Sequence, residues 1–430
     1  MKVDKHYKRS VILLILYEVL ILLINPENGS VLKIGISIFL IGSFASLIAY
    51  FIQNKKAIQF NFKRTFFLLI LLVLYGVINT IRSFELNTQV LVTLLGNKNT
   101  GLAMVLPLAF VSGLNVANII WFNKISVNML RIGLLLLPLS LLNGIFLDYS
   151  VYFLLFYIIP FILFFYQSNA NKRIVLCATI VLFVSAIFLS GRFNALQILF
   201  ITTCHIAYFI YDKVRIRYLR NLFIIAIIAF PFVIMLSGFQ IFEYFSSMSD
   251  VEIGATNTVD TRSFIYNEVP ADLEKNNAIV FGKGALGKYY SPYFAQGFQN
   301  ADNENRLNVE VGILSMMLKG GLVNVLLNLS LLLFALIASF KSRNKFTQRL
   351  SILVLCHFLS VFIADIPQYS MVNYSYWIVI GTCISLMVSQ TAEKDVILAF
   401  RSAELKKPNR KRIKISTITN RHMNLHGRNH

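Results

Sequence analysis

The sequence predicts an all-α polytopic membrane protein with about twelve transmembrane helices and one large extracytoplasmic loop. Of its 430 residues, 57% are hydrophobic and only 14% are charged, and the mean hydropathy is +0.66. Soluble domains carry about 25% charged residues, so this composition excludes a soluble globular protein. Apolar runs near the ~20 residues that cross a bilayer core recur along the chain. Basic residues gather at alternate links between these runs.

The apolar runs divide the chain into four parts. Residues 1–240 are expected to form an N-terminal bundle of about nine helices, and residues 320–392 hold the C-terminal helices. Residues 241–319 are expected to form the large loop with short helices, and 393–430 a basic cytoplasmic tail. The predicted spans are 11–24, 31–52, 65–81, 101–122, 129–147, 151–166, 174–190, 192–211, 221–240, 320–340, 350–366 and 372–390. The first run follows a basic start but has no small-residue cleavage site, so we expect a retained helix.

The distribution of Lys and Arg predicts the orientation. If the N-terminus is cytoplasmic and the links alternate, 29 of the 40 Lys and Arg fall on the cytoplasmic side. This is the positive-inside pattern, and it also makes the C-terminus cytoplasmic. The basic stretch "KKPNRKRIK" in the tail is expected to lie against anionic lipid headgroups. RNA binding is the alternative for this tail, but we expect membrane lipid and no nucleic acid as its partner.

The large loop has the composition of a carbohydrate site. Residues 241–310 hold ten of the twenty Asp and Glu, five basic residues and eleven aromatic residues, among them Tyr289 and Tyr290. Aromatic faces stack on sugars, and carboxylates and amides accept hydrogen bonds from hydroxyls. The alternative is a solvated loop in which a few aromatic residues pack together.

Four arginines are expected at the outer side. The run "VSAIFLSGRFNALQILFI" places Arg192 near the outer end of a span, where the positive-inside bias disfavours a cation. The alternative for Arg192 is a side chain that extends to the lipid headgroups. Arg82, Arg262 and Arg306 also fall outside. The guanidinium fork matches phosphate oxygens, so converging arginines would suit a lipid pyrophosphate.

Two nucleotide-binding motifs in the loop are incomplete. "FGKGALGKYY" fits both the dinucleotide and the phosphate-loop glycine spacing, but Tyr289 stands where the phosphate loop needs Ser or Thr. The dinucleotide motif also needs an α/β unit. We expect the glycines to form a tight turn whose backbone approaches a substrate or packs against a helix. The four cysteines and six histidines show no metal-site spacing, so we expect neither a metal nor a cofactor.

A broken helix is predicted after the loop. "NVEVGILSMMLKGGLVNVLLNLSLLLF", residues 308–334, indicates a short half-embedded helix, a break at Gly320 and Gly321, and then a span. Irregular backbone at membrane depth needs protein or water around it, which favours a cavity there.

These segments together resemble a known family. "LSGRFNAL", "TRSFIYNEV", "FGKGALGKY" and "NENRLNVEVGILSMMLKGGLVN" resemble the bacterial Wzy-type polysaccharide polymerases and the related O-antigen ligases, over roughly residues 184–330. The resemblance implies a GT-C-like fold in the bacterial plasma membrane. It implies transfer of a growing glycan from undecaprenyl pyrophosphate onto a lipid-linked repeat unit, in the synthesis of capsule, O-antigen or exopolysaccharide. Implied partners are the lipid-linked oligosaccharide, a flippase and a chain-length regulator.

The resemblance also implies roles for individual residues. Arg192 and Arg262 would hold the lipid pyrophosphate, with Arg306 as a third arginine. The ligases carry a catalytic histidine before the broken helix, whereas this chain has none between residues 206 and 356. Glu310 lies nearest that position and is the expected base, with Glu304 as the second candidate. The remaining expected substrate contacts are Arg82, Asn305, Tyr289 and Tyr290.

The implied chemistry agrees with these residue types. Fixed arginines stabilise a departing pyrophosphate electrostatically without a metal, and a carboxylate takes the proton of the attacking hydroxyl. The alternatives are an O-antigen ligase-type glycosyltransferase and a flippase or transporter. Transporters often show internal repeats and charges at mid-membrane. No repeat is visible here, and the few membrane-embedded charges are Glu18, Lys33, Arg131 and Lys319.

Overall fold

The computed structural model describes most of the chain as helices packed into one bundle. The described residues are 3–24, 30–61, 63–141, 144–188, 198, 202, 265–292, 305–342, 344–362, 367–389 and 393–404. Within these ranges, five stretches are long and apolar enough to cross a membrane, namely Leu32–Lys55, Thr65–Arg82, Val90–Gly113, Val116–Leu136 and Gly312–Phe340. Ser150–Ile162 and Met371–Met387 are shorter apolar helices. The predicted class, an all-α membrane protein, is confirmed.

The elements follow the chain as the sequence predicts in outline. The helices are α1 Lys5–Ile24, α2 Ser30–Asn61, α3 Lys63–Arg82, α4 Thr88–Gly96, α5 Gly101–Val105, α6 Phe110–Gly113, α7 Val116–Leu136, α8 Gly144–Leu154, α9 Ile158–Ile162, α10 Asn169–Phe188, α14 Ile265–Lys275, α16 Gly312–Lys341, α17 Lys345–Ser360, α18 Met371–Ser389 and α19 Glu393–Glu404. Short 3-10 turns are η2 Leu106–Ala109, η3 Pro138–Leu141, η4 Leu155–Tyr157 and η5 Phe164–Tyr166. Two short strands, β1 Tyr289–Tyr290 and β2 Asn305–Arg306, pair antiparallel.

The predicted spans 101–122 and 129–147 are wrong as single helices. The first is divided into α5, η2 and α6, because Pro107 lies at the start of η2 and cannot donate a backbone hydrogen bond. A new helix, α7, then begins after Asn115, whose side chain accepts a hydrogen bond from the Ala117 amide at 3.0 Å. The second predicted span straddles the end of α7, the turn η3 and the start of α8.

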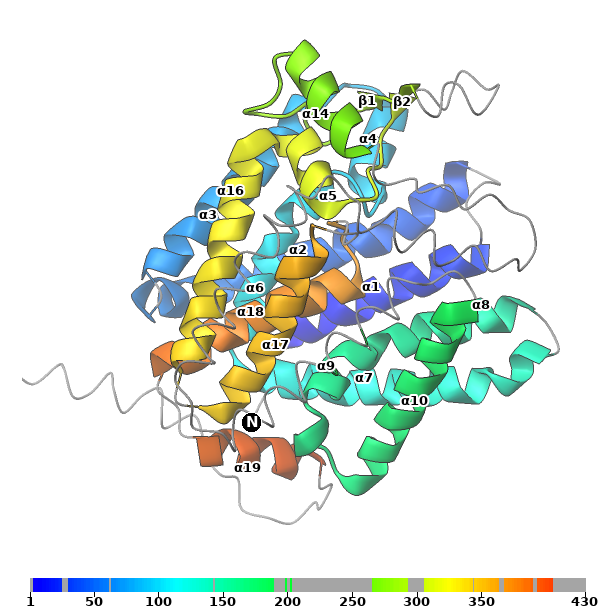
Figure 1. Cartoon of the computed structure of the whole chain (residues 1–430), viewed down its shortest axis with the longest axis vertical. Helices are drawn as coiled ribbons and strands as arrows, with labels where there is room; N and C mark the ends of the chain where they lie inside the picture. The colour runs from blue at the N-terminus through cyan, green and yellow to red at the C-terminus, as the bar shows by residue number, and fades with distance from the viewer. Residues whose placement is uncertain are drawn as a thin grey trace, which may run out of the picture.

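Helix α18 lies in the middle of the bundle and is buried along nearly its whole length (Figure 1). Glycines allow its backbone to touch α6, since a Cβ added at Gly113 would lie 1.9 Å from the Ile378 carbonyl oxygen. Hydroxyl groups link it to other helices. Tyr374 is 3.4 Å from both Ser10 of α1 and Ser112 of α6. Such contacts satisfy polar groups that have no water around them in a membrane.

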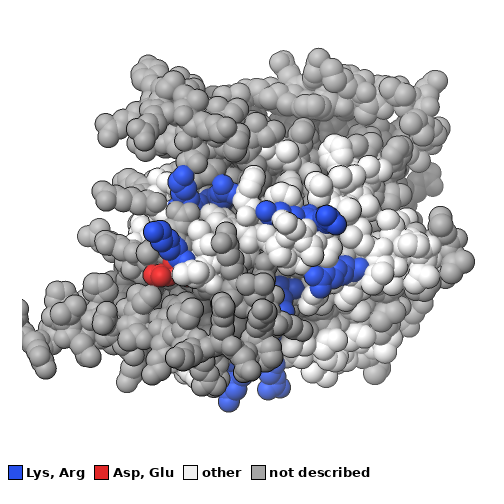
Figure 2. All heavy atoms as spheres, turned by 90° about the horizontal axis from the view of Figure 1, so that it is seen from below, with Lys and Arg blue, Asp and Glu red and all other residues white. Residues whose placement is uncertain are grey.

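A small cap covers one end of the bundle. We define the cap as the described residues 265–292 and 305–311, which include α14, β1 and β2. Figure 1 shows the cap above α16 and α5, whereas the N-terminus and α19 lie at the opposite end. Figure 2 shows this opposite end from below, where the described residues expose many Lys and Arg side chains and few Asp and Glu side chains.

Candidate functional site

The cap is joined to a break in α16. Gly321 has φ 62° and ψ −167°, which interrupts the helix, so the break predicted at Gly320 and Gly321 is confirmed. Four backbone hydrogen bonds to the cap replace bonds that a continuous helix would make. The donors and acceptors are Lys283 N to Leu318 O at 2.8 Å, Gly284 N to Lys319 O at 2.9 Å, Leu322 N to Ile279 O at 2.9 Å and Val323 N to Val280 O at 3.2 Å. The backbone polar groups at the break are therefore hydrogen-bonded to protein, which is what an irregular backbone inside a membrane would need.

Glycines make this contact possible. Gly282 has φ +64°, and an added Cβ would lie 2.5 Å from the amide nitrogens of both Gly320 and Gly321. A Cβ at Gly321 would lie 2.2 Å from the Val280 carbonyl oxygen. The glycine-rich motif thus forms a tight turn that packs against a helix, one of the two arrangements predicted for it.

Arg82 holds this turn against α3. Its Nη1 donates to the Phe281 carbonyl at 2.7 Å and to Asn79 Oδ1 at 3.1 Å, and its Nη2 donates to the Gly282 carbonyl at 3.0 Å. The Tyr75 hydroxyl adds a hydrogen bond to the Gly320 carbonyl at 2.7 Å. The role of Arg82 in the structure is therefore to fix the cap to the bundle. Its predicted substrate contact stays a prediction.

The two predicted tyrosines lie in different environments. Tyr289 pairs with Arg306 in the β-ladder and is fully buried, and its predicted substrate contact stays a prediction. Burial raises the pKa of the Tyr289 hydroxyl, and the neighbouring Arg306 charge partly opposes that rise. Tyr290 is 46% exposed and pairs with the exposed Asn305. These last two side chains are open to a ligand.

Arg306 and Glu310 are brought together where the cap meets α16. Arg306 Nη2 lies 3.7 Å from Glu310 Oε1, and the two side chains are 25% and 37% exposed. Val309 and Val311 are fully buried on either side of Glu310, which anchors this segment at the start of α16. An arginine side chain that is partly exposed beside a carboxylate can bind an anion and accept a proton at neighbouring points. Arg192, Arg262 and Glu304 lie outside the described residues.

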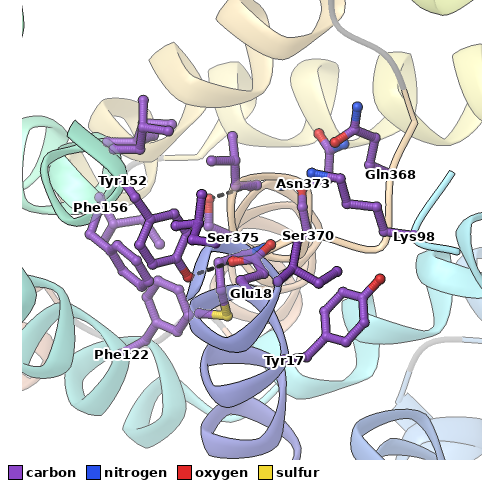
Figure 3. Close-up of a pocket in the computed structure, with 17 residues that line it drawn as sticks. Tyr17, Glu18, Lys98, Phe122, Tyr152, Phe156, Gln368, Ser370, Asn373 and Ser375 are labelled. Atoms are coloured by element: carbon purple, nitrogen blue, oxygen red, sulfur yellow. Dashed lines mark hydrogen bonds between the residues drawn. The ribbon is translucent and has the colours of Figure 1, made fainter. Parts of the chain in front are cut away.

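A cavity of about 310 Å³ lies within the bundle (Figure 3). Its charged and polar lining residues are Tyr17, Glu18, Lys98, Tyr152, Gln368, Ser370, Asn373 and Ser375. Its apolar lining residues are Ile21, Leu22, Phe122, Leu155, Phe156, Ile158, Ile159, Met371 and Val372. The Glu18 carboxylate is 9% exposed and accepts hydrogen bonds from the Tyr152 hydroxyl at 2.6 Å and the Met371 amide at 2.9 Å.

Lys319 connects this cavity with the broken helix. Its side chain is 3% exposed, and its ammonium donates to the Asn99 carbonyl, next to Lys98 in the chain. A smaller cavity of about 30 Å³ lies beside Lys319, and Asn373 lines both cavities. A continuous set of contacts therefore runs from the cap, through the break, to the larger cavity.

The sequence signals only one lining residue of each cavity. Glu18 in the larger cavity and Lys319 beside the smaller one stand out as charges within apolar runs, and such charges are by default candidates for function. Lys98, Tyr152 and Asn373 carry no comparable signal, because each belongs to an ordinary loop or helix end. His357 of α17 stacks on Tyr376 of α18, with ring centroids 4.1 Å apart.

Within the described ranges, no cluster of three or more His, Cys, Asp and Glu is arranged to hold a metal ion. Comparison of the chain with known protein families, with curated proteins and with solved structures finds no match. The class that fold and composition define is that of an all-α membrane protein.

Proposed function

We propose that this protein is a membrane glycosyltransferase that polymerises lipid-linked oligosaccharide repeat units. It would transfer a growing glycan from undecaprenyl pyrophosphate onto a lipid-linked repeat unit at the outer face of the bacterial plasma membrane. The observation that carries this proposal is the Arg306–Glu310 pair at the junction of the cap and the broken helix. It supplies an anion-binding group and a proton acceptor on one short segment.

In the proposed reaction, a sugar hydroxyl of the acceptor attacks the anomeric carbon of the donor. Glu310 accepts the hydroxyl proton as the new C–O bond forms. The bond between the anomeric carbon and the pyrophosphate oxygen breaks, and undecaprenyl pyrophosphate leaves with the electron pair. Arg306 stabilises the negative charge that develops on this leaving group. Arg192 and Arg262 are proposed as further pyrophosphate contacts.

The ion pair itself would respond to the substrate. In the structure the Arg306 guanidinium lies beside the Glu310 carboxylate at 3.7 Å, longer than a close charge-assisted hydrogen bond of about 2.8 Å. A pyrophosphate offers more oxygens and more charge than one carboxylate, so it competes for the guanidinium. Binding of the donor would therefore release Glu310 to act on the acceptor hydroxyl.

The proposed orientation places the cap outside the cell and the N-terminus and α19 inside. The basic face opposite the cap supports this, because Lys and Arg predominate on the cytoplasmic side of membrane proteins (Figure 2). The reaction would then take place beside the outer leaflet. The GT-C-like fold and the full number of spans belong to this proposal.

Polymer length in cells tests the proposal. A strain that lacks the gene should attach single repeat units to its acceptor, and the wild-type gene should restore a ladder of long polymer on a gel. Glu310→Gln and Arg306→Ala should leave single units. Glu274→Gln is the matched control, since Glu274 is an exposed carboxylate on α14 of the same cap.

Two outcomes contradict the proposal. Long polymer in both Glu310→Gln and Arg306→Ala would show that neither residue takes part in the reaction as proposed. A deletion strain with no unit on the acceptor would instead indicate an O-antigen ligase-type enzyme or a flippase, because these act before or at the attachment step.

A further inference from the structure

The 310 Å³ cavity has two chemically different walls. Figure 3 shows Phe122, Tyr152 and Phe156 on one side, and Lys98, Gln368 and Asn373 on the other. Glu18 lies between the two sides. The aromatic wall comes from α7, α8 and η4, whereas the polar wall comes from the loop before α5, from the segment just before α18 and from the start of α18.

We propose that this cavity binds one sugar residue of the lipid-linked oligosaccharide. A sugar ring has an apolar face of C–H groups and an edge of hydroxyls, which matches one aromatic and one polar wall. The volume is at the lower end of small-molecule pockets, which run from about 300 to 1,000 Å³, so it suits a single ring. That the sugar belongs to a lipid-linked oligosaccharide rests on the proposed function. That the cavity walls match a sugar ring follows from the lining residues alone.

Glu18 is arranged to accept hydrogen bonds from the sugar. The Tyr152 hydroxyl and the Met371 amide each donate to one of its oxygens, so the carboxylate is held in one orientation. An ionised carboxylate has about four acceptor positions, and these two donors leave others for hydroxyls. A carboxylate inside an apolar bundle is costly unless it is paired, which makes this position unusual for a purely packing role.

Lys98 supplies the opposite charge across the cavity. Its backbone is fixed, because its carbonyl accepts a hydrogen bond from the Tyr369 amide at 2.7 Å. Its ammonium makes no hydrogen bond to any residue that the structure describes, and it lines the same cavity as Glu18. It can therefore donate to a ring hydroxyl or to an acidic substituent of the sugar.

The cavity also has a physical connection to the proposed reaction centre. Asn99, which follows Lys98, accepts a hydrogen bond from Lys319 just before the break in α16. Residues on both sides of that break are hydrogen-bonded to the cap that carries Glu310. A sugar residue bound in the cavity would thus be held on a framework continuous with the Arg306–Glu310 pair.

Binding of a defined probe tests this inference directly. The full-length protein would be placed in lipid nanodiscs, and the host's repeat-unit oligosaccharide, released from its lipid by mild acid, would be titrated by saturation-transfer NMR. We expect saturable binding that Lys98→Ala and Glu18→Gln each weaken at least tenfold. Lys124→Ala is the matched control, because Lys124 is exposed on α7 and does not line the cavity. The affinity of this variant should equal that of the wild type.

The buried Glu18→Gln variant could fail to fold. The Lys98→Ala variant should still fold, because Lys98 is only half-buried, and it then decides the test alone. Folding would be checked by size exclusion and thermal unfolding. Absence of saturable binding to the wild type, or wild-type affinity in a folded Lys98→Ala variant, would overturn the inference.

The outcomes separate this inference from the proposed function. Glu310→Gln should stop polymerisation but keep oligosaccharide binding. If Lys98→Ala loses binding while Glu310→Gln still makes long polymer, the sugar site stands and the proposed reaction fails. If Lys98→Ala binds normally while Glu310→Gln makes only single units, the sugar site fails and the proposed reaction stands.

Discussion

The backbone of Gly282 in the cap lies directly against that of Gly321 in α16, with no side chain between them. Both residues have a positive φ, so the contact depends on glycine at each position. Through it, the turn of the cap supplies hydrogen bonds to a membrane helix that is interrupted at that level. The geometry of the cap and the geometry of the helix are therefore set together.

Gly282→Ala should separate the cap from α16. The added Cβ would lie 2.5 Å from two backbone nitrogens and would require a left-handed conformation, which costs about 1–2 kcal/mol before any clash. We expect a lower unfolding temperature and little polymer. Gly35→Ala is the control, because a Cβ there meets nothing within 4 Å. Equal stability of the two variants would contradict the observed packing.

Arg82→Ala should loosen the cap rather than act only on substrate affinity. The variant loses hydrogen bonds to the carbonyls of Phe281 and Gly282, each worth up to about 1.5–3 kcal/mol for a charged donor and less at this exposed position. Limited proteolysis should cut the cap faster than in the wild type. The control is Lys275→Ala, an exposed cation on α14. An unchanged cleavage rate in Arg82→Ala would mean that the arginine does not hold the turn.

Glu310→Gln should lower activity without lowering stability. The pair with Arg306 is long and partly exposed, so it contributes at most about 1 kcal/mol to the free energy of unfolding. Loss of a general base lowers the rate by about 10²–10⁴-fold. Polymer formation per folded protein and the unfolding temperature would be measured side by side. A loss of polymer that merely follows a loss of folded protein would point to a structural role.

Tyr289→Phe should reduce the sensitivity of the protein to alkali. The pKa of Tyr289 is raised from its ordinary value of 10.0 by burial, so the folded state prefers the neutral phenol. Its contribution to stability is complete below the unfolded-state pKa and is lost as the pH rises towards the folded-state pKa. Above pH ~10 the wild type should lose more unfolding free energy than the variant. Parallel pH curves would show that Tyr289 ionises as freely when folded.

The sequence predicts local features better than it predicts contacts between residues that are far apart in the chain. Two consecutive glycines in an apolar run are enough to place the break in α16, because no other residue tolerates that conformation so readily. Glu310 and Arg306 are four residues apart, so their proximity is also a local matter. Glu18, by contrast, meets groups 134 and 353 residues away, and only the packing of whole helices decides that.

The limits of the predicted spans show the same difference. Hydropathy alone predicts one helix from 101 to 122, since Ser112, Asn115 and Asn118 are isolated polar residues in an apolar stretch. In the structure Asn115 caps a new helix, and Asn118 donates to the Tyr50 hydroxyl at 3.2 Å. Hydropathy counts how polar a residue is, but not whether its side chain ends a helix or joins two of them.

The central place of α18 affects how the protein is made. Ribosomes synthesise α1, α2 and α6 long before residues 371–389, yet the hydroxyls of Ser10 and Ser112 meet Tyr374 of that late helix. Until α18 is inserted, the hydroxyls of Ser10 and Ser112 lack their contact with Tyr374. Nascent chains that stop before residue 371 should therefore be recognised by quality-control proteases, whereas chains cut after α18 should survive.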